Sequence, residues 1–132
     1  MKTLLLTPLF AAAAIGVSAC GSDDKPAESV NSGARSALTE VDATRDGLKA
    51  ARTSYLAGDK AKAGDQASEA YLQHFEHVEG PLETKDHELN EKLEDGIREE
   101  LRDEIRSGTR EEVEARFDML FADLDKAEAA LR

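Results

Sequence analysis

The sequence predicts an all-α fold: an antiparallel up-down four-helix bundle after a cleaved signal peptide and a flexible tether. From residue 34 to the chain end, apolar residues recur at steps of three and four, the spacing of one helix face. Glycine, proline and capping residues interrupt this periodicity three times, which leaves four segments. No segment shows the alternation of a strand, and the short connections favour antiparallel neighbours.

The first 19 residues predict export. A short basic head, Met1-Lys2-Thr3, precedes an apolar run that extends from Leu4 to Val17 and is followed by small residues. This order is typical of a secretory signal peptide. The run contains Pro8 and is shorter than the roughly 20 residues that a membrane-spanning helix needs, so we expect cleavage rather than a membrane span.

The residues Val17-Ser18-Ala19-Cys20 resemble the lipobox of bacterial lipoproteins. The resemblance implies that the Cys20 sulfur receives diacylglycerol, that residues 1–19 are removed, and that the new amino group is acylated, for example with palmitate. Such an anchor would hold the protein outside the cytoplasm, on the outer membrane facing the periplasm or on the outer face of the plasma membrane. Cys20 is the only cysteine, so no intramolecular disulfide is expected.

Residues 20–33 follow as a lipidated tether. Their sequence is polar, small and poor in apolar anchors, which is typical of a flexible segment. The bundle is predicted to occupy residues 34–132. Because a chain of this size can bury a core of its own, we expect a monomer.

The first two predicted helices lie between residue 34 and the dipeptide Gly80-Pro81. Gly58 should end the first helix in a left-handed conformation, and Asp59 should cap the second, which runs from Lys60 to about Glu79. The expected inward residues of both helices are Ala34, Ala37, Val41, Thr44, Leu48, Ala51, Tyr55, Ala63, Ala67, Ala70, Tyr71, Phe75 and Val78. The alanines of the second helix predict a close approach to its neighbours.

The third and fourth predicted helices complete the bundle. The third extends from Asp86 to Ser107, and Gly108 ends it. Thr109 and Glu112 have the spacing of a capping box, which opens the fourth helix. The expected inward residues are Leu89, Leu93, Ile97, Leu101, Ile105, Val113, Phe117, Leu120, Leu124, Ala127 and Leu131.

The charge of the chain excludes one class of partner. It carries 28 acidic and 17 basic side chains, a formal net charge of −11, whereas nucleic-acid binding requires a basic face. This acidity suits cations or basic partners, and it equally suits a solvated surface without a ligand. The chain has no nucleophile elbow, phosphate-binding loop or His-Glu-x-x-His motif, so we expect no enzymatic activity.

The three histidines predict the location of a metal site. Antiparallel return of the chain after Pro81 would bring the second and third helices together at one end, where Glu40 and Asp42 of the first helix also reach. Imidazoles and carboxylates from several helices are how bundles bind transition metals. The candidate ligands for iron or another transition metal are His74, Glu76, His77, Glu79, His87 and Glu88. The alternative is that these side chains are solvated surface groups.

Two acidic residues of the third helix fall on its predicted inward side. Glu100 and Glu104 lie angularly between Leu93 and Leu101. A carboxylate that faces the core needs a partner or a raised pKa. The alternatives are buried acid-base chemistry and a salt bridge at the rim of the core, with Arg102, Arg106 or Arg116 as partner.

Residues 48 to 131 resemble a known family in four places. These are Leu48 to Asp59, the pattern Ala70-Tyr71-x-x-x-Phe75-Glu76-x-x-Glu79, Leu89 to Glu94, and the closing Ala-Glu-Ala-Ala-Leu. They look like the helical extracytoplasmic domain that is fused to some bacterial high-affinity iron permeases. The resemblance implies a helical domain associated with iron handling, in which Glu76 and Glu79 match the Phe-Glu-x-x-Glu motif.

Two functions are therefore expected from the sequence. The first is a lipid-anchored accessory or binding protein for iron or another cation, acting beside a permease. The second is a non-enzymatic interaction module that docks a different envelope protein.

Overall fold

The computed structural model describes residues 27–132, and every regular element in that range is helical. The elements are α1 (Ala27–Leu56), α2 (Lys60–Ala70), η1 (Tyr71–Phe75), α3 (Glu76–Glu83), α4 (His87–Asp95), η2 (Gly96–Glu100), α5 (Leu101–Ser107) and α6 (Arg110–Leu131). The η elements are π-helical turns that continue the helices on either side. The prediction of an all-α chain is confirmed for these residues. Cys20 and the predicted signal peptide lie outside them.

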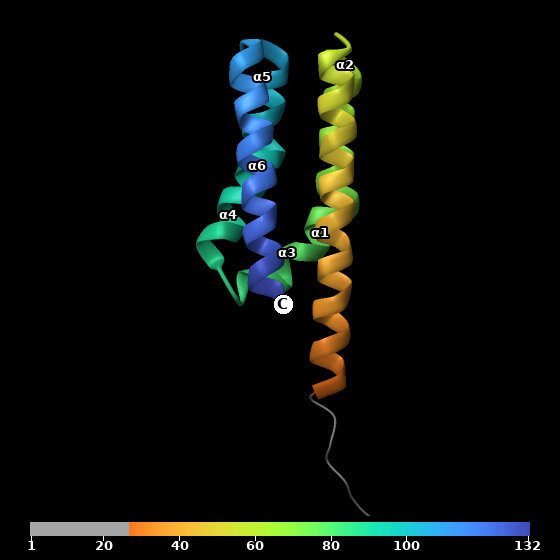
Figure 1. Cartoon of the computed structure of the whole chain (residues 1–132), viewed down its shortest axis with the longest axis vertical. Coiled ribbons are helices and arrows are strands. Elements are labelled where there is room, and N and C mark those ends of the chain that lie inside the picture. Colours follow the sequence, from red (N-terminus) through yellow and green to blue (C-terminus); the bar gives the residue numbers. More distant parts are fainter. Residues whose placement is uncertain (1–26) are drawn as a thin grey trace, which may run out of the picture.

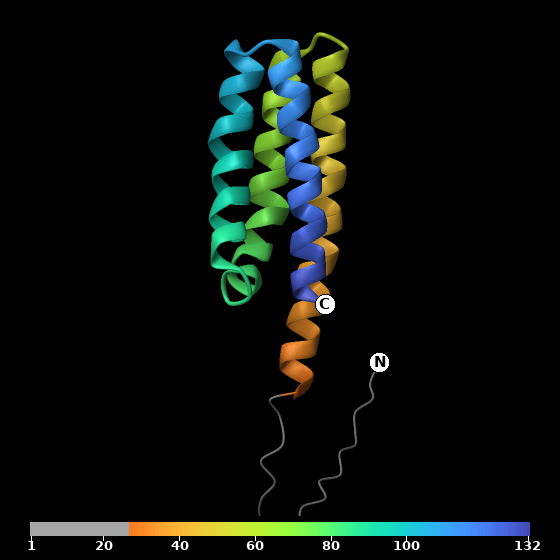
Figure 2. The same cartoon turned by 60° about the vertical axis from the view of Figure 1, so that its left-hand side comes forward.

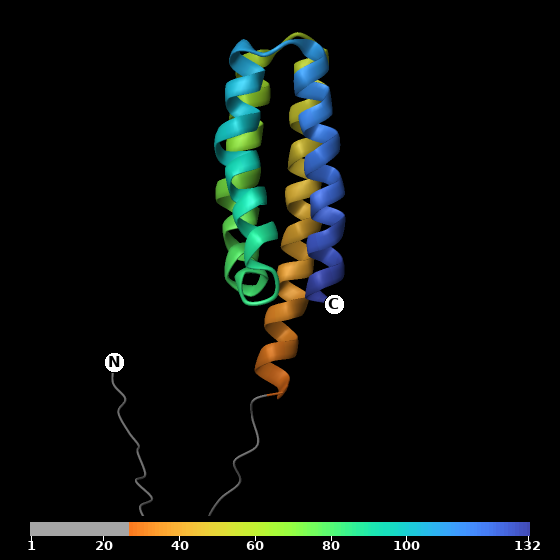
Figure 3. The same cartoon turned by 90° about the vertical axis from the view of Figure 1, so that its left-hand side faces the viewer.

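The helices lie side by side along one common direction (Figures 1 and 2). α1 packs against α2 and α6, and α2 also packs against α5. The α1–α2 and α5–α6 turns lie together at one end, whereas the α3–α4 turn lies at the other end, near the C-terminus (Figure 3). The N-terminal part of α1 extends past the C-terminal end of α6.

The chain turns have the predicted local chemistry. Gly58 has a φ of +87°, a conformation that glycine adopts without steric cost. The Asp59 side chain accepts a hydrogen bond from the Lys62 amide at 3.0 Å, which caps α2. Thr109 and Glu112 form the reciprocal capping box of α6. These turns are determined by residues within one or two helical turns, which explains why the sequence alone predicts them.

The first helix begins earlier than the sequence predicted. α1 starts at Ala27, so residues 27–33, which were assigned to the tether, are helical. Ala27 and Glu28 have high helix propensity, and a helix that is already held by buried residues such as Ala37 and Val41 extends by one hydrogen bond per added residue. The polar composition of this segment did not predict its helical conformation.

The predicted end of the second helix at Gly80-Pro81 is wrong. The helix continues to Glu83, with Pro81 in its last turn. Proline costs about 3 kcal/mol in a helix interior, but continuation buries Leu82 completely, which contributes about 1.5–3 kcal/mol. The chain reverses only afterwards, where the amides of Lys85 and Asp86 both donate to the Leu82 carbonyl, at 2.9 and 2.7 Å.

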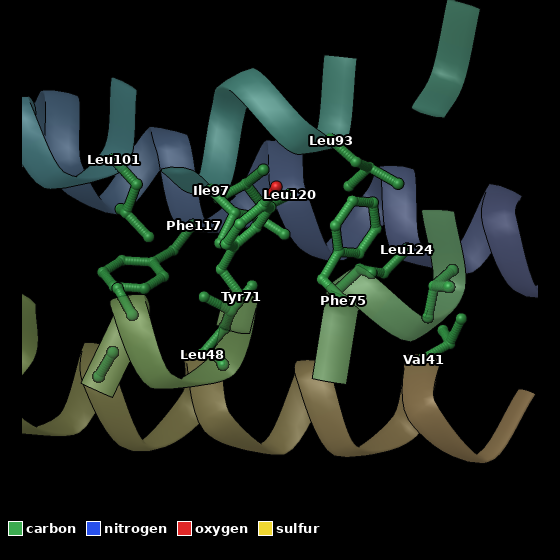
Figure 4. Packing of buried hydrophobic residues seen from close by; sticks show 14 of the residues in the cluster. Val41, Leu48, Tyr71, Phe75, Leu93, Ile97, Leu101, Phe117, Leu120 and Leu124 are labelled. Atoms are coloured by element: carbon green, nitrogen blue, oxygen red, sulfur yellow. The ribbon is translucent and has the colours of Figure 1, made fainter. Parts of the chain in front are cut away.

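One continuous apolar core fills the space between the helices (Figure 4). The largest fully buried side chains come from every helical segment except α2, whose buried residues are alanines: Phe75, Phe117, Leu48, Leu82, Leu93, Ile97, Leu101, Ile105, Leu124, Val41, Val78 and Val113. Each was on a predicted inward stripe, apart from Leu82. A close helix contact occurs at Gly47 of α1, where an added Cβ would lie 2.8 Å from the Ala70 Cβ of α2.

The π-helical turn η2 explains how apolar residues spaced four apart can all face the core. The large apolar residues that are buried from Leu89 to Ile105 recur at steps of four. In an α-helix each such step rotates the side chain by about 40°, so four steps would carry it roughly 160° round the axis. At η2 the Leu101 amide bonds to the Gly96 carbonyl, five residues back, which underwinds the helix. The stripe therefore stays inward along its whole length.

Candidate functional site

The structure places His74 in a contact with the first helix. Its Nδ1 lies 2.9 Å from Glu40 Oε2, and both side chains are partly buried. Asp42, which was expected at the same end, bonds instead to Arg45 at 2.6 Å. His74 therefore joins η1 to α1 through one carboxylate.

The other candidate ligands on this helix are directed elsewhere. Glu79 accepts a hydrogen bond from the Tyr71 hydroxyl at 2.7 Å. Glu76 and His77 are exposed. His74 and His77 are three residues apart, about 60° round an α-helix, but His77 is exposed whereas His74 contacts α1.

His87 and Glu88 lie in the first turn of α4, on the far side of the chain reversal. His87 Nδ1 lies 2.7 Å from Glu83 Oε1, and its Nε2 lies 3.5 Å from Glu91 Oε1. The hydrogen bond with Glu83 is the main cause of a raised pKa of His87. The second Glu83 oxygen accepts a hydrogen bond from the Asn90 side-chain Nδ2 at 3.1 Å. This group joins the end of α3 to the start of α4.

The six predicted metal ligands are therefore divided between separate contacts. Among residues 27–132, no group of three or more His, Cys, Asp or Glu side chains is placed to hold one metal ion. The geometry does not support the predicted site as a single centre. The reason is that each of these two imidazoles is paired with a different carboxylate: His74 with Glu40 of α1, and His87 with Glu83, four residues before it.

Glu100 and Glu104 form the rim salt bridge that was one of their two alternatives. Arg116 of α6 donates to Glu104 Oε1 at 2.7 Å and to Glu100 Oε2 at 2.5 Å. Hydrogen bonding to Glu104 is the main cause of a raised pKa of Arg116. Glu104 keeps a quarter of its side chain exposed and Glu100 half. Both carboxylates are thus paired and solvent-accessible rather than buried.

A groove between the two π-helical turns is the main surface feature that sequence reasoning missed. It is a hollow of about 300 Å³ lined by Ser68, Tyr71, Leu72, Glu76, Arg98 and Arg102. Leu72 of η1 is 53% exposed, the largest value among the exposed large apolar residues of the described chain. π-Helical turns occur frequently at functional sites. Here the two turns face each other across the groove.

A second hollow continues the groove toward the α5–α6 turn. It has a volume of about 280 Å³ and is lined by Lys60, Ala61, Gly64, Asp65, Arg102, Ile105 and Arg106. Arg102 belongs to both hollows, so together they form one groove between α2–η1 and η2–α5. We call this surface the η1–η2 groove. The signals that point to it are the four-residue steps of buried residues and the equally spaced Arg98, Arg102 and Arg106.

The inner wall of the groove contains a tyrosine with an altered acidity. Burial is the largest cause that raises the pKa of Tyr71 to about 12, followed by its hydrogen bond to Glu79. The Arg98 guanidinium opposes this rise, and contact with the Tyr71 hydroxyl raises the pKa of Arg98 in turn. Tyr71 therefore connects the wall of the groove to Glu79, eight residues further along the chain in α3.

This acidity predicts a loss of stability at high pH. The pKa of Tyr71 in the folded protein is above the ordinary value of about 10. The neutral Tyr71 hydroxyl therefore contributes its full share to the free energy of unfolding below pH 10, and this share is lost as the pH rises to about 12. The loss should reach roughly 2–3 kcal/mol. Urea unfolding between pH 9 and 12 measures it, and Tyr71→Phe should remove this part of the pH dependence. In a folded Tyr55→Phe variant Tyr71 is the one remaining tyrosine, and titration of its hydroxyl near pH 10 would contradict the prediction.

The described residues contain no helix long and apolar enough to cross a membrane. Comparisons with protein-family models, curated proteins and solved structures found no match to the chain.

Proposed function

We propose that the protein is a lipid-anchored extracytoplasmic interaction module that docks an envelope protein and catalyses no reaction. In this proposal residues 1–19 are removed, Cys20 carries the lipid, and the helices form an up-down antiparallel bundle that presents the partner-binding surface. The observation that carries the proposal is the η1–η2 groove, in which an exposed Leu72 lies beside arginines. Exposed apolar side chains with arginine are typical of protein-binding surfaces.

The position of the groove suits this function. α1 has 30 residues, so it is about 45 Å long. A lipid on Cys20 would lie beyond its N-terminal end, whereas α2 and α5 adjoin the turns at the opposite end. The groove, on the flank of the bundle between these helices, would then lie at a distance from the membrane and within reach of proteins of the envelope.

The cation-handling alternative, including iron, receives less support. A transition-metal site in a bundle needs several ligands directed at one point. His74 and His87 instead bind carboxylates of different helices, at Glu40 and Glu83.

Site-specific photo-cross-linking in intact cells tests the proposal. A photoreactive amino acid in place of Leu72 should give one defined adduct with an envelope protein in the membrane fraction. Met119 on α6 is a matched control, because it is 46% exposed and does not line the groove. Equal adducts from both positions, or none from Leu72, would contradict the proposal.

A further inference from the structure

We propose that the η1–η2 groove binds an acidic, amphipathic helical segment of the partner protein. The inference rests on the proposed function and names the chemistry of its partner. It is carried by the charge of the groove, by the spacing of its arginines and by the apolar contact beside them.

The groove is basic on an otherwise acidic protein. The charged residues that line it are Lys60, Arg98, Arg102 and Arg106 against Asp65 and Glu76. The whole chain has the opposite balance, with 28 acidic and 17 basic side chains. A local excess of cations attracts an anionic partner and steers its approach.

The arginines are available to a partner. Arg102 is exposed, and no hydrogen bond or ion pair to it occurs among the described residues. Arg98 pairs with Glu94 and Glu99 and also contacts the Tyr71 hydroxyl, and Arg106 pairs with Asp103. The two arginine side chains nevertheless remain 50% and 71% exposed. Such exposed pairs contribute little to stability. A partner carboxylate can therefore replace them.

The spacing of the arginines matches a helix. Arg98, Arg102 and Arg106 are four residues apart on the continuous η2–α5 helix, so neighbouring guanidinium groups are separated by about one turn, roughly 6 Å along the axis. Glutamates at i, i+4 and i+8 of a partner helix have the same spacing. Each guanidinium can bind a carboxylate through two parallel hydrogen bonds.

The apolar wall favours a protein segment over an anionic polymer. Leu72 is 53% exposed next to the arginine row. An amphipathic helix offers an apolar side chain that would cover Leu72 while its glutamates meet the arginines. A phosphate polymer offers no such group and would leave Leu72 in water. The groove thus combines both contacts that an acidic amphipathic helix makes.

The test uses the full chain in a neutral detergent and a fluorescein-labelled synthetic helix with Glu at i, i+4 and i+8 and Leu on the same face. Fluorescence anisotropy measures binding. Arg98→Glu/Arg102→Glu/Arg106→Glu should weaken binding by about tenfold or more, because attraction becomes repulsion at three contacts. A peptide with Lys in place of Glu should bind this variant better than the original chain.

A charge-matched variant separates the groove from bulk acidity. Lys49→Glu/Arg110→Glu/Arg132→Glu changes the net charge equally at side chains that are 59%, 65% and 69% exposed and do not line the groove. It should weaken binding by no more than about twofold, because distant exposed charges are screened by salt. Arg102→Glu alone, which breaks no hydrogen bond or ion pair among residues 27–132, should already weaken peptide binding measurably.

The possible failures have distinct meanings. Equal weakening by the two triple variants, or no binding of the acidic helix, overturns the inference. Inorganic polyphosphate that binds as tightly as the peptide, with no effect of Leu72→Ser on either, would mean that the groove recognises phosphate. A defined cross-link from Leu72 that still forms in the Arg98→Glu/Arg102→Glu/Arg106→Glu variant would support the proposed function and rule out an acidic partner.

Discussion

Replacement of Phe75 by alanine should lower the free energy of unfolding by about 3–5 kcal/mol. Phe75 is fully buried, and its ring centroid lies 6.1 Å from that of Tyr71. Figure 4 places it between the α4 and α1 sides of the core, near Leu93 and Leu124. Truncation removes apolar contacts with several helices at once and leaves a cavity that they cannot fill without moving. Urea unfolding followed by circular dichroism measures the loss.

Leu93→Ala should destabilise the chain similarly, by about 2–5 kcal/mol, because Leu93 is also fully buried. Leu72→Ala is the matched control. Its side chain is half exposed, so the change should stay within about 0.5 kcal/mol. Losses below about 0.5 kcal/mol at both Phe75 and Leu93 would show that these side chains do not form the core in solution.

Replacement of Cys20 by serine should move the protein from the membrane fraction to the soluble fraction. The proposed anchor requires the cysteine sulfur, and each methylene of an acyl chain contributes about 0.8 kcal/mol to membrane binding. No helix of the described residues can replace the anchor by spanning the bilayer. Fractionation and gel mobility of the two forms measure the effect, since loss of lipid and of cleavage both change mobility.

Ser18→Ala is a suitable control, because it alters the same segment without removing the sulfur that would carry the lipid. It should leave the protein in the membrane fraction. A Cys20→Ser protein that stays there with the mobility of the original chain would reject the lipid anchor.

The π-helical turns show how far sequence patterns reach. The inward positions of Leu93, Ile97 and Leu101 follow from apolar periodicity, and the structure buries all three. Their strict spacing of four also indicates a helix wound less tightly than an α-helix. The spacing of four therefore indicates that the helix is underwound, but it does not indicate at which turn. Packing against α6 and α2 decides where along the helix the π-helical turn occurs.

The candidate metal site shows where sequence patterns fail. Residue types and the chain reversal predicted that His74, His87 and their neighbouring carboxylates share one end of the molecule, but His74 contacts Glu40 of α1 and His87 contacts Glu83 of α3. Ligation depends on side-chain directions to within a fraction of an ångström. Those directions depend on helix rotation and on Glu40, which is 34 residues away from His74 in the sequence. No local pattern contains this information.

The sequence by itself determined the helices, the turns at Gly58-Asp59 and Thr109 and the apolar stripes, because capping and periodicity act over one or two helical turns. Only the tertiary structure decided that the helix passes through Pro81, that Arg116 binds Glu100 and Glu104, and that Leu72 lies beside Arg98 and Arg102. These features depend on how neighbouring helices are rotated and shifted against each other. That arrangement is selected by packing of the whole core, in which every helix contributes at once.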